Sequence, residues 1–143
     1  MIIADANLFI WMVTGPQTDA NSALFRYSDA FFSAAEREEL TFTTSEAIIA
    51  EAVWVLAGRY GIDRADIAIR LSSLLRLRGC NMPTRDLCIE ALGRWKASRR
   101  VSFVDCLAAR MAEQSGNQLA TLDRDLFRHT LAAVWQPIAG GST

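Results

Sequence analysis

The chain opens with the stretch MIIADANLF (residues 1–9), in which a short apolar run with two isoleucines leads directly into Asp5. The run over residues 1–4 predicts a β-strand. Asn7 is a good N-cap residue and predicts a helix over residues 8–13, which Gly15 and Pro16 end. The chain therefore begins with a strand that passes through an acidic residue into a helix.

The same alternation continues along the chain. Further strands are predicted at residues 40–42 and 118–121, with shorter ones at 80–82 and 134–135. Helices are predicted at about 19–38, 45–58, 64–77, 84–96 and 102–116. Strands that alternate with helices predict an α/β fold, a three-layer α/β/α sandwich with a mostly parallel central sheet. We expect one domain over residues 1–137 and a flexible tail at 138–143.

Composition narrows the class of protein. The 143 residues are 51% hydrophobic and carry a formal net charge of −1, so no overall basic field indicates a nucleic-acid binder. Of the 15 basic residues only Lys96 is lysine. Arginine binds phosphate in a bidentate manner, so this bias suits phosphate chemistry, although a genomic codon preference would produce it too.

The cysteines and the apolar runs indicate a cellular compartment. The three cysteines lie in apolar runs without a C-x-x-C pair, which argues against a disulfide framework or a structural zinc site. The chain has no basic leader and no apolar run long enough to span a bilayer. We therefore expect a cytoplasmic protein without a membrane association.

Four of the 16 acidic residues stand among apolar neighbours. They are Asp5, Glu51, Asp105 and Asp123. An unpaired carboxylate in apolar surroundings costs several kcal/mol, so a partner is expected for each. Asp5 and Asp123 directly follow predicted strands, and in open α/β sheets the sites gather at the carboxyl ends of the strands.

Glu51 is preferred to Glu46 as a site residue. Glu51 lies three residues after Ile48 and four before Val55, which places it on the predicted inward stripe of its helix. Glu46 is roughly 140° away around the same helix and completes a capping box with Thr43. A partner arginine is the alternative explanation for Glu51.

The three aspartates also have structural alternatives. Asp105 matches a capping box with Ser102, although the small residues on its face (Ala108, Ala109 and Ala112) would let the helix approach a sheet and bring Asp105 to the strand ends. Asp123 could form an Asx turn. Asp5 could cap the first helix, but Asn7 is better placed for that role.

Taken together, the four acids favour a metal site. Four converging carboxylates would repel one another unless a cation lay between them, and oxygen ligands favour Mg²⁺ or Mn²⁺. Other chemistries lack their residues. His129 is the only histidine and is expected on the surface of the last helix, so a histidine acid/base pair cannot form within one chain. The P-loop and nucleophile-elbow motifs are absent.

The order of these motifs resembles the PIN domain. The motifs are Asp-x-Asn after the first strand, a glutamate in a helix containing Trp-Val-Leu, Phe-Val-Asp at a helix start, and Thr-Leu-Asp-Arg-Asp after a strand. More narrowly, the chain is similar to the VapC group of toxins from type II toxin–antitoxin systems. The similarity runs from Met1 to about Trp135.

The resemblance implies a function and a site. It implies a Mg²⁺- or Mn²⁺-dependent endoribonuclease that forms a homodimer and binds a cognate antitoxin. It places the metal on Asp5, Glu51, Asp105 and Asp123. It also gives supporting roles to Asn7, Thr121 and Asp125.

Basic residues suggest where RNA could bind. Arg124 and Arg128 lie close to Asp123 in the sequence and could hold flanking phosphates. Arg99 and Arg100 belong to a basic segment that also contains Trp95, and such a segment could hold single-stranded RNA by charge and stacking. The alternative is a solvated helix end with a buried Trp95.

Other functions stay open at this point. The chain could be an inactive RNA- or protein-binding module, or a nuclease of RNA maturation or repair. It could also be a Mg²⁺-dependent phosphatase that uses acidic residues, although such an enzyme would need an Asp-x-Asp pair after the first strand and Asn7 stands in the second place. An antitoxin could dock near Trp11, Phe31 and Trp54, although these aromatic residues could equally belong to the core.

Overall fold

The computed structural model describes residues 1–16 and 18–138. A small parallel sheet forms its centre, in which β1 (Ile2–Ile3) pairs with β2 (Phe42–Thr43). Phe42 also forms a parallel bridge with Cys80 on its other side. The predicted strand at residues 80–82 is therefore present as a single bridge, and β2 lies between β1 and Cys80.

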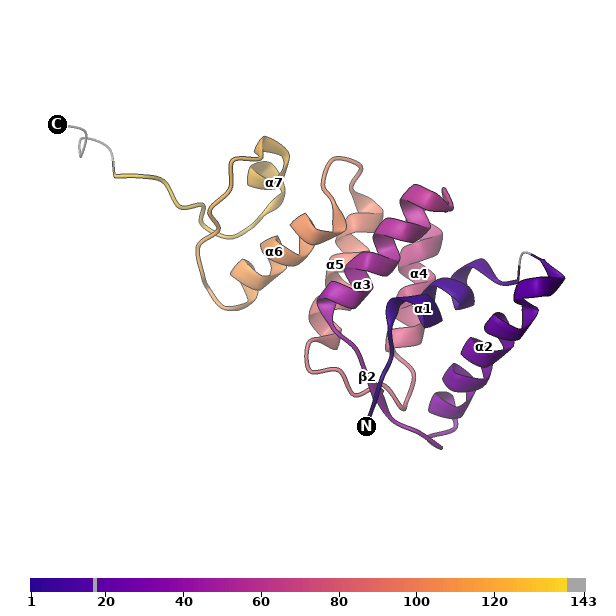
Figure 1. Cartoon of the computed structure of the whole chain (residues 1–143). Coiled ribbons are helices and arrows are strands. Elements are labelled where there is room, and N and C mark those ends of the chain that lie inside the picture. Colours follow the sequence, from indigo (N-terminus) through magenta and orange to yellow (C-terminus); the bar gives the residue numbers. More distant parts are fainter. Residues whose placement is uncertain (17, 139–143) are drawn as a thin grey trace.

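Helices make up most of the described chain (Figure 1). A 3₁₀ turn, η1 (Asp19–Asn21), precedes α2, and a π-helical segment, η2 (Val55–Arg59), continues α3. The helices are α1 (Ala6–Thr14), α2 (Ser22–Glu36), α3 (Glu46–Trp54), α4 (Arg64–Leu75), α5 (Arg85–Ala97), α6 (Phe103–Gln114) and α7 (Arg124–His129). The fold is α/β with a parallel sheet, consistent with the predicted α/β/α arrangement.

Aromatic side chains connect the sheet to the first helices. Phe42 of β2 is fully buried, and its ring centroid lies 6.5 Å from that of Phe9 in α1 and 5.7 Å from that of Phe32 in α2. Phe31 packs against the same ring at 5.4 Å. Rings at these distances and tilted angles attract one another beyond their buried area. This cluster fixes α1 and α2 against β2.

Gly79 allows the close approach of the segment that leads to Cys80. Its N–H donates to the carbonyl oxygen of Ala35, and its own carbonyl accepts from Phe42. A Cβ atom at this position would lie 2.4 Å from the carbonyl oxygen of Leu40 and 2.7 Å from that of Ala35. Any larger residue would push this crossing apart, so glycine is required for contact rather than for backbone freedom.

The start of α3 differs from the prediction. Ser45 is the N-cap, and its hydroxyl accepts from the N–H of Ile48. The predicted capping box between Thr43 and Glu46 is wrong, because Thr43 belongs to β2 and Glu46 is already the first residue of the helix. The β pairing of Thr43 takes precedence over its capping propensity.

The last part of the chain forms a separate unit, which we call the C-terminal arm (residues 118–135). The N–H of Leu119 donates to Ala133, and the N–H of Trp135 donates to Leu119, both at 2.8 Å. These bonds form a parallel bridge between Leu119 and Val134. In Figure 1 the arm and α7 lie on the far side of α6 from β1.

The position of the arm corrects one prediction. Residues 118–121 and 134–135 were expected in the central sheet, but the described chain pairs them only with each other. Strand propensity is a local property, whereas the choice of partner depends on distant residues. Of the predicted tail at 138–143, Ile138 is exposed and residues 139–143 lie outside the described residues.

None of the described helices combines the length and the apolar character that crossing a bilayer requires.

Candidate active site

Asp5 ends β1 and begins α1. Its backbone is extended, and its Oδ1 atom accepts the N–H of Asn7 at 2.7 Å, so Asp5 is the N-cap. The prediction that Asn7 caps this helix is wrong, because helical geometry begins at Ala6 and leaves Asn7 inside the first turn. Asn7 nevertheless contacts Asp5 through its backbone. Both side chains are exposed.

Glu51 lies on the outer side of α3. The residues that face the core are Ile49, Ala52 and Val53, whereas Glu51 is exposed. The predicted inward stripe is therefore wrong, since Ile48 and Val55, which defined it, are only half-buried. An exposed carboxylate carries no desolvation cost, so Glu51 requires no partner arginine.

Asp105 forms the capping box that its spacing allowed. Its N–H donates to the hydroxyl of Ser102 at 3.0 Å, and its Oδ2 atom accepts the N–H of Ser102 at 3.2 Å. The helix it begins, α6, contacts α5, α3 and α7. The small residues of its face, with Ala109 and Ala112 buried, therefore serve packing between helices, and the expectation that they approach the sheet is not met.

Asp123 caps α7 in the arm. Its Oδ1 atom accepts the N–H groups of Asp125 at 2.8 Å and Leu126 at 3.2 Å. Its own N–H donates to the hydroxyl of Thr121 at 3.0 Å, so Thr121 fixes the backbone before the cap. The acidic residues Asp5, Asp105 and Asp123 thus all bind helix N-termini, where the helix dipole favours a negative charge.

The structure does not gather the four acids at one point. Across residues 1–16 and 18–138, no three acidic, cysteine or histidine side chains are close enough to hold a metal ion together. The chemistry of the four residues suits Mg²⁺, because all are oxygen donors and none is fully buried. Their placement in this arrangement does not suit it, since Asp123 is carried by the arm.

The basic residues lie on the side of the arm. Arg124 and Arg128 are exposed on α7, and Arg99 and Arg100 are exposed in the loop between α5 and α6. An ion pair of 3.9 Å between Arg100 and Asp125 brings this loop next to α7. The predicted RNA-binding arginines therefore occupy neighbouring segments of the surface.

Trp95 is not available for stacking on RNA. Its side chain is buried, its ring lies 6.5 Å from that of Phe103, and the guanidinium of Arg64 lies 5.1 Å from its centroid. Arg64 also donates to the carbonyl oxygens of Ser98 and Val101. The alternative of a helix end with a buried Trp95 is thus confirmed, and Arg64 holds the loop that carries Arg99 and Arg100.

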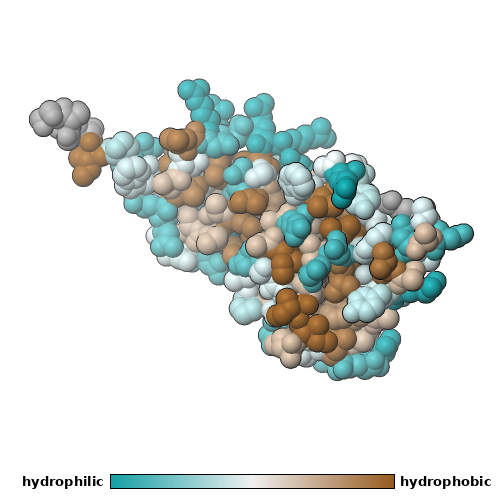
Figure 2. All heavy atoms as spheres, viewed as in Figure 1, coloured by the Kyte–Doolittle hydropathy of each residue, from teal (hydrophilic) through white to brown (hydrophobic). Residues whose placement is uncertain are grey.

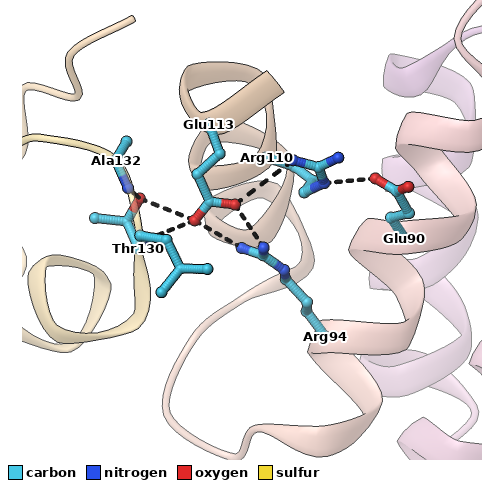
Figure 3. A network of polar contacts seen from close by, with 7 residues as sticks. Glu90, Arg94, Arg110, Glu113, Thr130 and Ala132 are labelled. Atoms are coloured by element: carbon cyan, nitrogen blue, oxygen red, sulfur yellow. Dashed lines mark hydrogen bonds and ion pairs between the residues drawn. The ribbon is translucent and has the colours of Figure 1, made fainter. Parts of the chain in front are cut away.

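A polar network that the sequence analysis missed connects α5, α6 and the arm (Figure 3). Arg94 of α5 donates to Oε1 of Glu113 at 3.0 Å and lies 2.5 Å from Oε2. The same carboxylate accepts the N–H of Leu131 at 2.5 Å and the hydroxyl of Thr130 at 3.3 Å. Arg110 and Glu113, three residues apart on one helix, were the only sequence signal for it.

The network perturbs the ionisation of Glu113. Its side chain is only 8% exposed, and this burial on its own would raise the pKa of the carboxyl group. The hydrogen bonds from Arg94, Leu131 and Thr130 outweigh the burial and hold the pKa below its ordinary value of 4.5. Glu113 therefore stays charged and joins the arm to the helices.

The single histidine is not a surface residue. His129 is half-buried at the end of α7, and its Nε2 atom is enclosed with no hydrogen-bond partner among the described residues. The expectation of a surface position is wrong, because α7 packs against α6 and His129 is partly covered.

Comparison with known proteins identifies the family. The sequence matches the PIN domain over residues 2–131, which is most of the chain. The protein therefore belongs to the PIN domain family, a family of nucleases, and this supports a ribonuclease-like function. No curated protein matches the chain.

Proposed function

We propose that the protein is a Mg²⁺- or Mn²⁺-dependent endoribonuclease and the toxin of a type II toxin–antitoxin pair. The observation that carries the proposal is membership of the PIN family over residues 2–131. PIN domains are generally metal-dependent nucleases. Asp5, Glu51, Asp105 and Asp123 are the residues that we assign to the metal site.

Several features of the structure support binding of RNA. Arg124 directly follows Asp123, Arg128 is exposed on the same helix α7, and an ion pair with Asp125 brings Arg100 next to this helix. Guanidinium groups hold phosphates in a bidentate manner, so these residues can fix the substrate backbone beside the acids. In this proposal Asn7 and Thr121 orient Asp5 and Asp123, and Asp125 positions Arg100.

The expected protein partner is a cognate antitoxin. Of the three aromatic residues considered for its docking, Phe31 is half-buried against the core, Trp11 is half-buried, and Trp54 is 76% exposed. Trp54 borders an apolar hollow of about 360 Å³ that is also lined by Val53, Phe103 and Val104. We assign the antitoxin to this hollow, and we assign the toxin itself to the cytoplasm, which its three buried free cysteines suit.

The test uses cleavage of a mixed cellular RNA by the full chain with Mn²⁺ or with EDTA. Asp5 and Asp123 are N-caps, and asparagine caps helices as well as aspartate does. The variants Asp5→Asn and Asp123→Asn therefore remove charge and keep the fold. We expect a loss of about 100-fold or more in rate, equivalent to about 3 kcal/mol of transition-state stabilisation.

The control is Asp29→Asn, an exposed aspartate on α2. It should cleave like the wild type. Equal rates in Asp5→Asn and the wild type, or full activity in EDTA, would contradict the proposed chemistry. A protein that binds RNA but cleaves none would favour the alternative of an inactive binding module. Growth arrest on expression, absent in Asp5→Asn, would support the toxin role.

A further inference from the structure

The sheet has an open edge along β1. The N–H groups of Ile2 and Ala4 donate to Thr41 and Thr43 beside β2, at 3.2 and 2.9 Å. Successive residues of a strand point their backbone groups to opposite edges, so the N–H and C=O of Ile3 face away from β2. No described strand pairs with that edge. Ile2 and Ile3 are 45% and 63% exposed, and Figure 2 shows hydrophobic atoms at the surface near this end of the chain.

The C-terminal arm has a matching open edge. Leu119 uses its N–H and C=O to pair with Ala133 and Trp135. The backbone groups of Gln118 and Ala120 therefore face the opposite edge, where no described segment pairs with them. All the bridges of the structure are parallel, so residues 118–121 added to β1 would extend one parallel sheet. Leu122, which directly follows this segment, is fully exposed.

The anchor at Glu113 keeps the arm away from the β1 of its own chain. Glu113 binds Thr130 and Leu131 of the arm, and it also binds Arg94 of α5. A second ion pair, between Arg110 and Glu90, ties α6 to α5. These contacts hold the arm on the far side of α6 from β1 (Figure 1). An edge that its own chain leaves uncovered is available to a second molecule.

We propose that two copies of this chain exchange their arms, with residues 118–121 of each copy pairing in parallel with β1 of the other. Pairing of strand edges and exchange of an identical element are both common routes to a symmetric dimer. The arm keeps its contacts with Glu113 in this dimer. Both open edges and the exposed Ile3 and Leu122 are covered.

The exchange also completes the acidic site. The two pairing segments end at Ile3 and at Thr121. Asp5 and Asp123 each lie two residues further along the chain. Since the carboxyl ends of parallel strands meet at one edge, Asp123 of one copy comes to Asp5 of the other. The dimer then contains two sites, each built from both chains. Only this catalytic part rests on the proposed function, because the exchange itself rests on the strand edges.

Cross-linking of the full-length protein tests the exchange. We would mix tagged Ile3→Cys chains with untagged Leu122→Cys chains, allow them to re-associate, and treat them with a short bismaleimide at pH 7. The native thiols should not compete, since burial raises the pKa of Cys88 to about 12 and that of Cys106 to about 11, and also raises that of Cys80. We expect a tagged–untagged product and a dimeric mass in light scattering.

Controls separate the other ways of covering the edge. Tagged Ile3→Cys mixed with Leu24→Cys, an exposed leucine on α2, should not cross-link. The double variant Ile3→Cys plus Leu122→Cys should give linked dimers. If it gives only an internally linked monomer, the arm closes on its own chain and the proposal is wrong. A monomeric wild type without any cross-link would also overturn it.

Complementation tests the shared site by activity. Asp5→Asn and Asp123→Asn chains are each inactive as homodimers, because every site lacks one carboxylate. In a mixed dimer with exchanged arms, one of the two sites is intact and the other has lost both groups. Mixing equal amounts should restore about one quarter of wild-type activity.

No restoration in a cross-linked mixed dimer would overturn the shared site. If the wild-type protein cleaves no RNA, the proposed function fails, while the cross-linking result still decides the exchange.

Discussion

The body of the protein (residues 1–114) and the C-terminal arm differ in how far they bury their hydrophobic side chains. In the body they form one continuous core that runs from Ala4 to Leu107. In the described arm only Leu126 is a buried hydrophobic residue, while Phe127, Leu131 and Trp135 are at least half exposed. The body is therefore held by packing, whereas the arm is held mainly by the polar contacts of Glu113. The difference shows that the arm keeps its position without burying its own apolar side chains, and the proposed exchange of arms would cover part of that surface.

The largest change in stability is expected when a side chain at the centre of the core is removed. We expect Phe42→Ala to lower the free energy of unfolding by about 3–5 kcal/mol, because it leaves a cavity among Phe9, Phe31 and Phe32. The matched control is Phe127→Ala in the arm, which should cost less than about 1.5 kcal/mol because the side chain is half exposed. Urea denaturation measures both, and similar losses would show that the arm shares the core.

A smaller loss of stability is expected when the contacts of Glu113 with the arm are weakened. Glu113→Gln removes the charge that Arg94 and the arm share, and it should cost about 1–3 kcal/mol. The loss should be local, so hydrogen exchange should accelerate at the amides of Leu119 and Trp135 before it does in α4. Glu90→Gln, at the exposed end of the same network, should cost at most about 1 kcal/mol. Unchanged protection in the arm of Glu113→Gln would show that the anchor lies elsewhere.

The smallest effect should be a dependence on pH. Because folding lowers the pKa of Glu113, its contribution to stability is fully present above its ordinary value of 4.5 and is lost as pH falls through the lowered value. Protection factors in the arm should therefore decrease in this acidic range while those of the body hold. The Glu113→Gln variant should lack this acidic step, and an identical step in the variant would assign it to another group.

The sequence was sufficient for the local elements but not for their long-range pairing. The helices α1 to α6 were predicted to within a few residues, and β1 and β2 were located, since periodicity and turn residues are local signals; the bounds of α7 were not predicted. Residues 118–121 pair with residues 134–135 instead of β1, and this choice of partner depends on distant contacts such as those of Glu113, which are not local properties. The two wrong caps arose at Asn7 and Thr43, where two good capping residues stand close together.

The candidate site shows the same difference between local features, which the sequence predicts, and long-range placement, which it does not. The sequence selected the acidic residues by their apolar neighbours; the match to the PIN family supports a nuclease, and the choice of residues stays a prediction. It misjudged the direction of Glu51, because its helix has apolar residues on more than one side and the inner face was assigned to Ile48 instead of Ile49. It could not foresee that the acids would be carried by two separate parts of the molecule.

The capping role of the two aspartates has a genetic consequence. Asp5 and Asp123 cap helices through Oδ1, asparagine preserves those caps, and it removes the charge that the proposed metal site requires. A single G-to-A transition in the first codon position converts aspartate to asparagine. If the protein is the toxin that we propose, a selection for bacteria that survive its expression should therefore recover such transitions at codons 5 and 123 as full-length, folded protein. Most other survivors would carry stop codons or core substitutions, and their protein would be degraded.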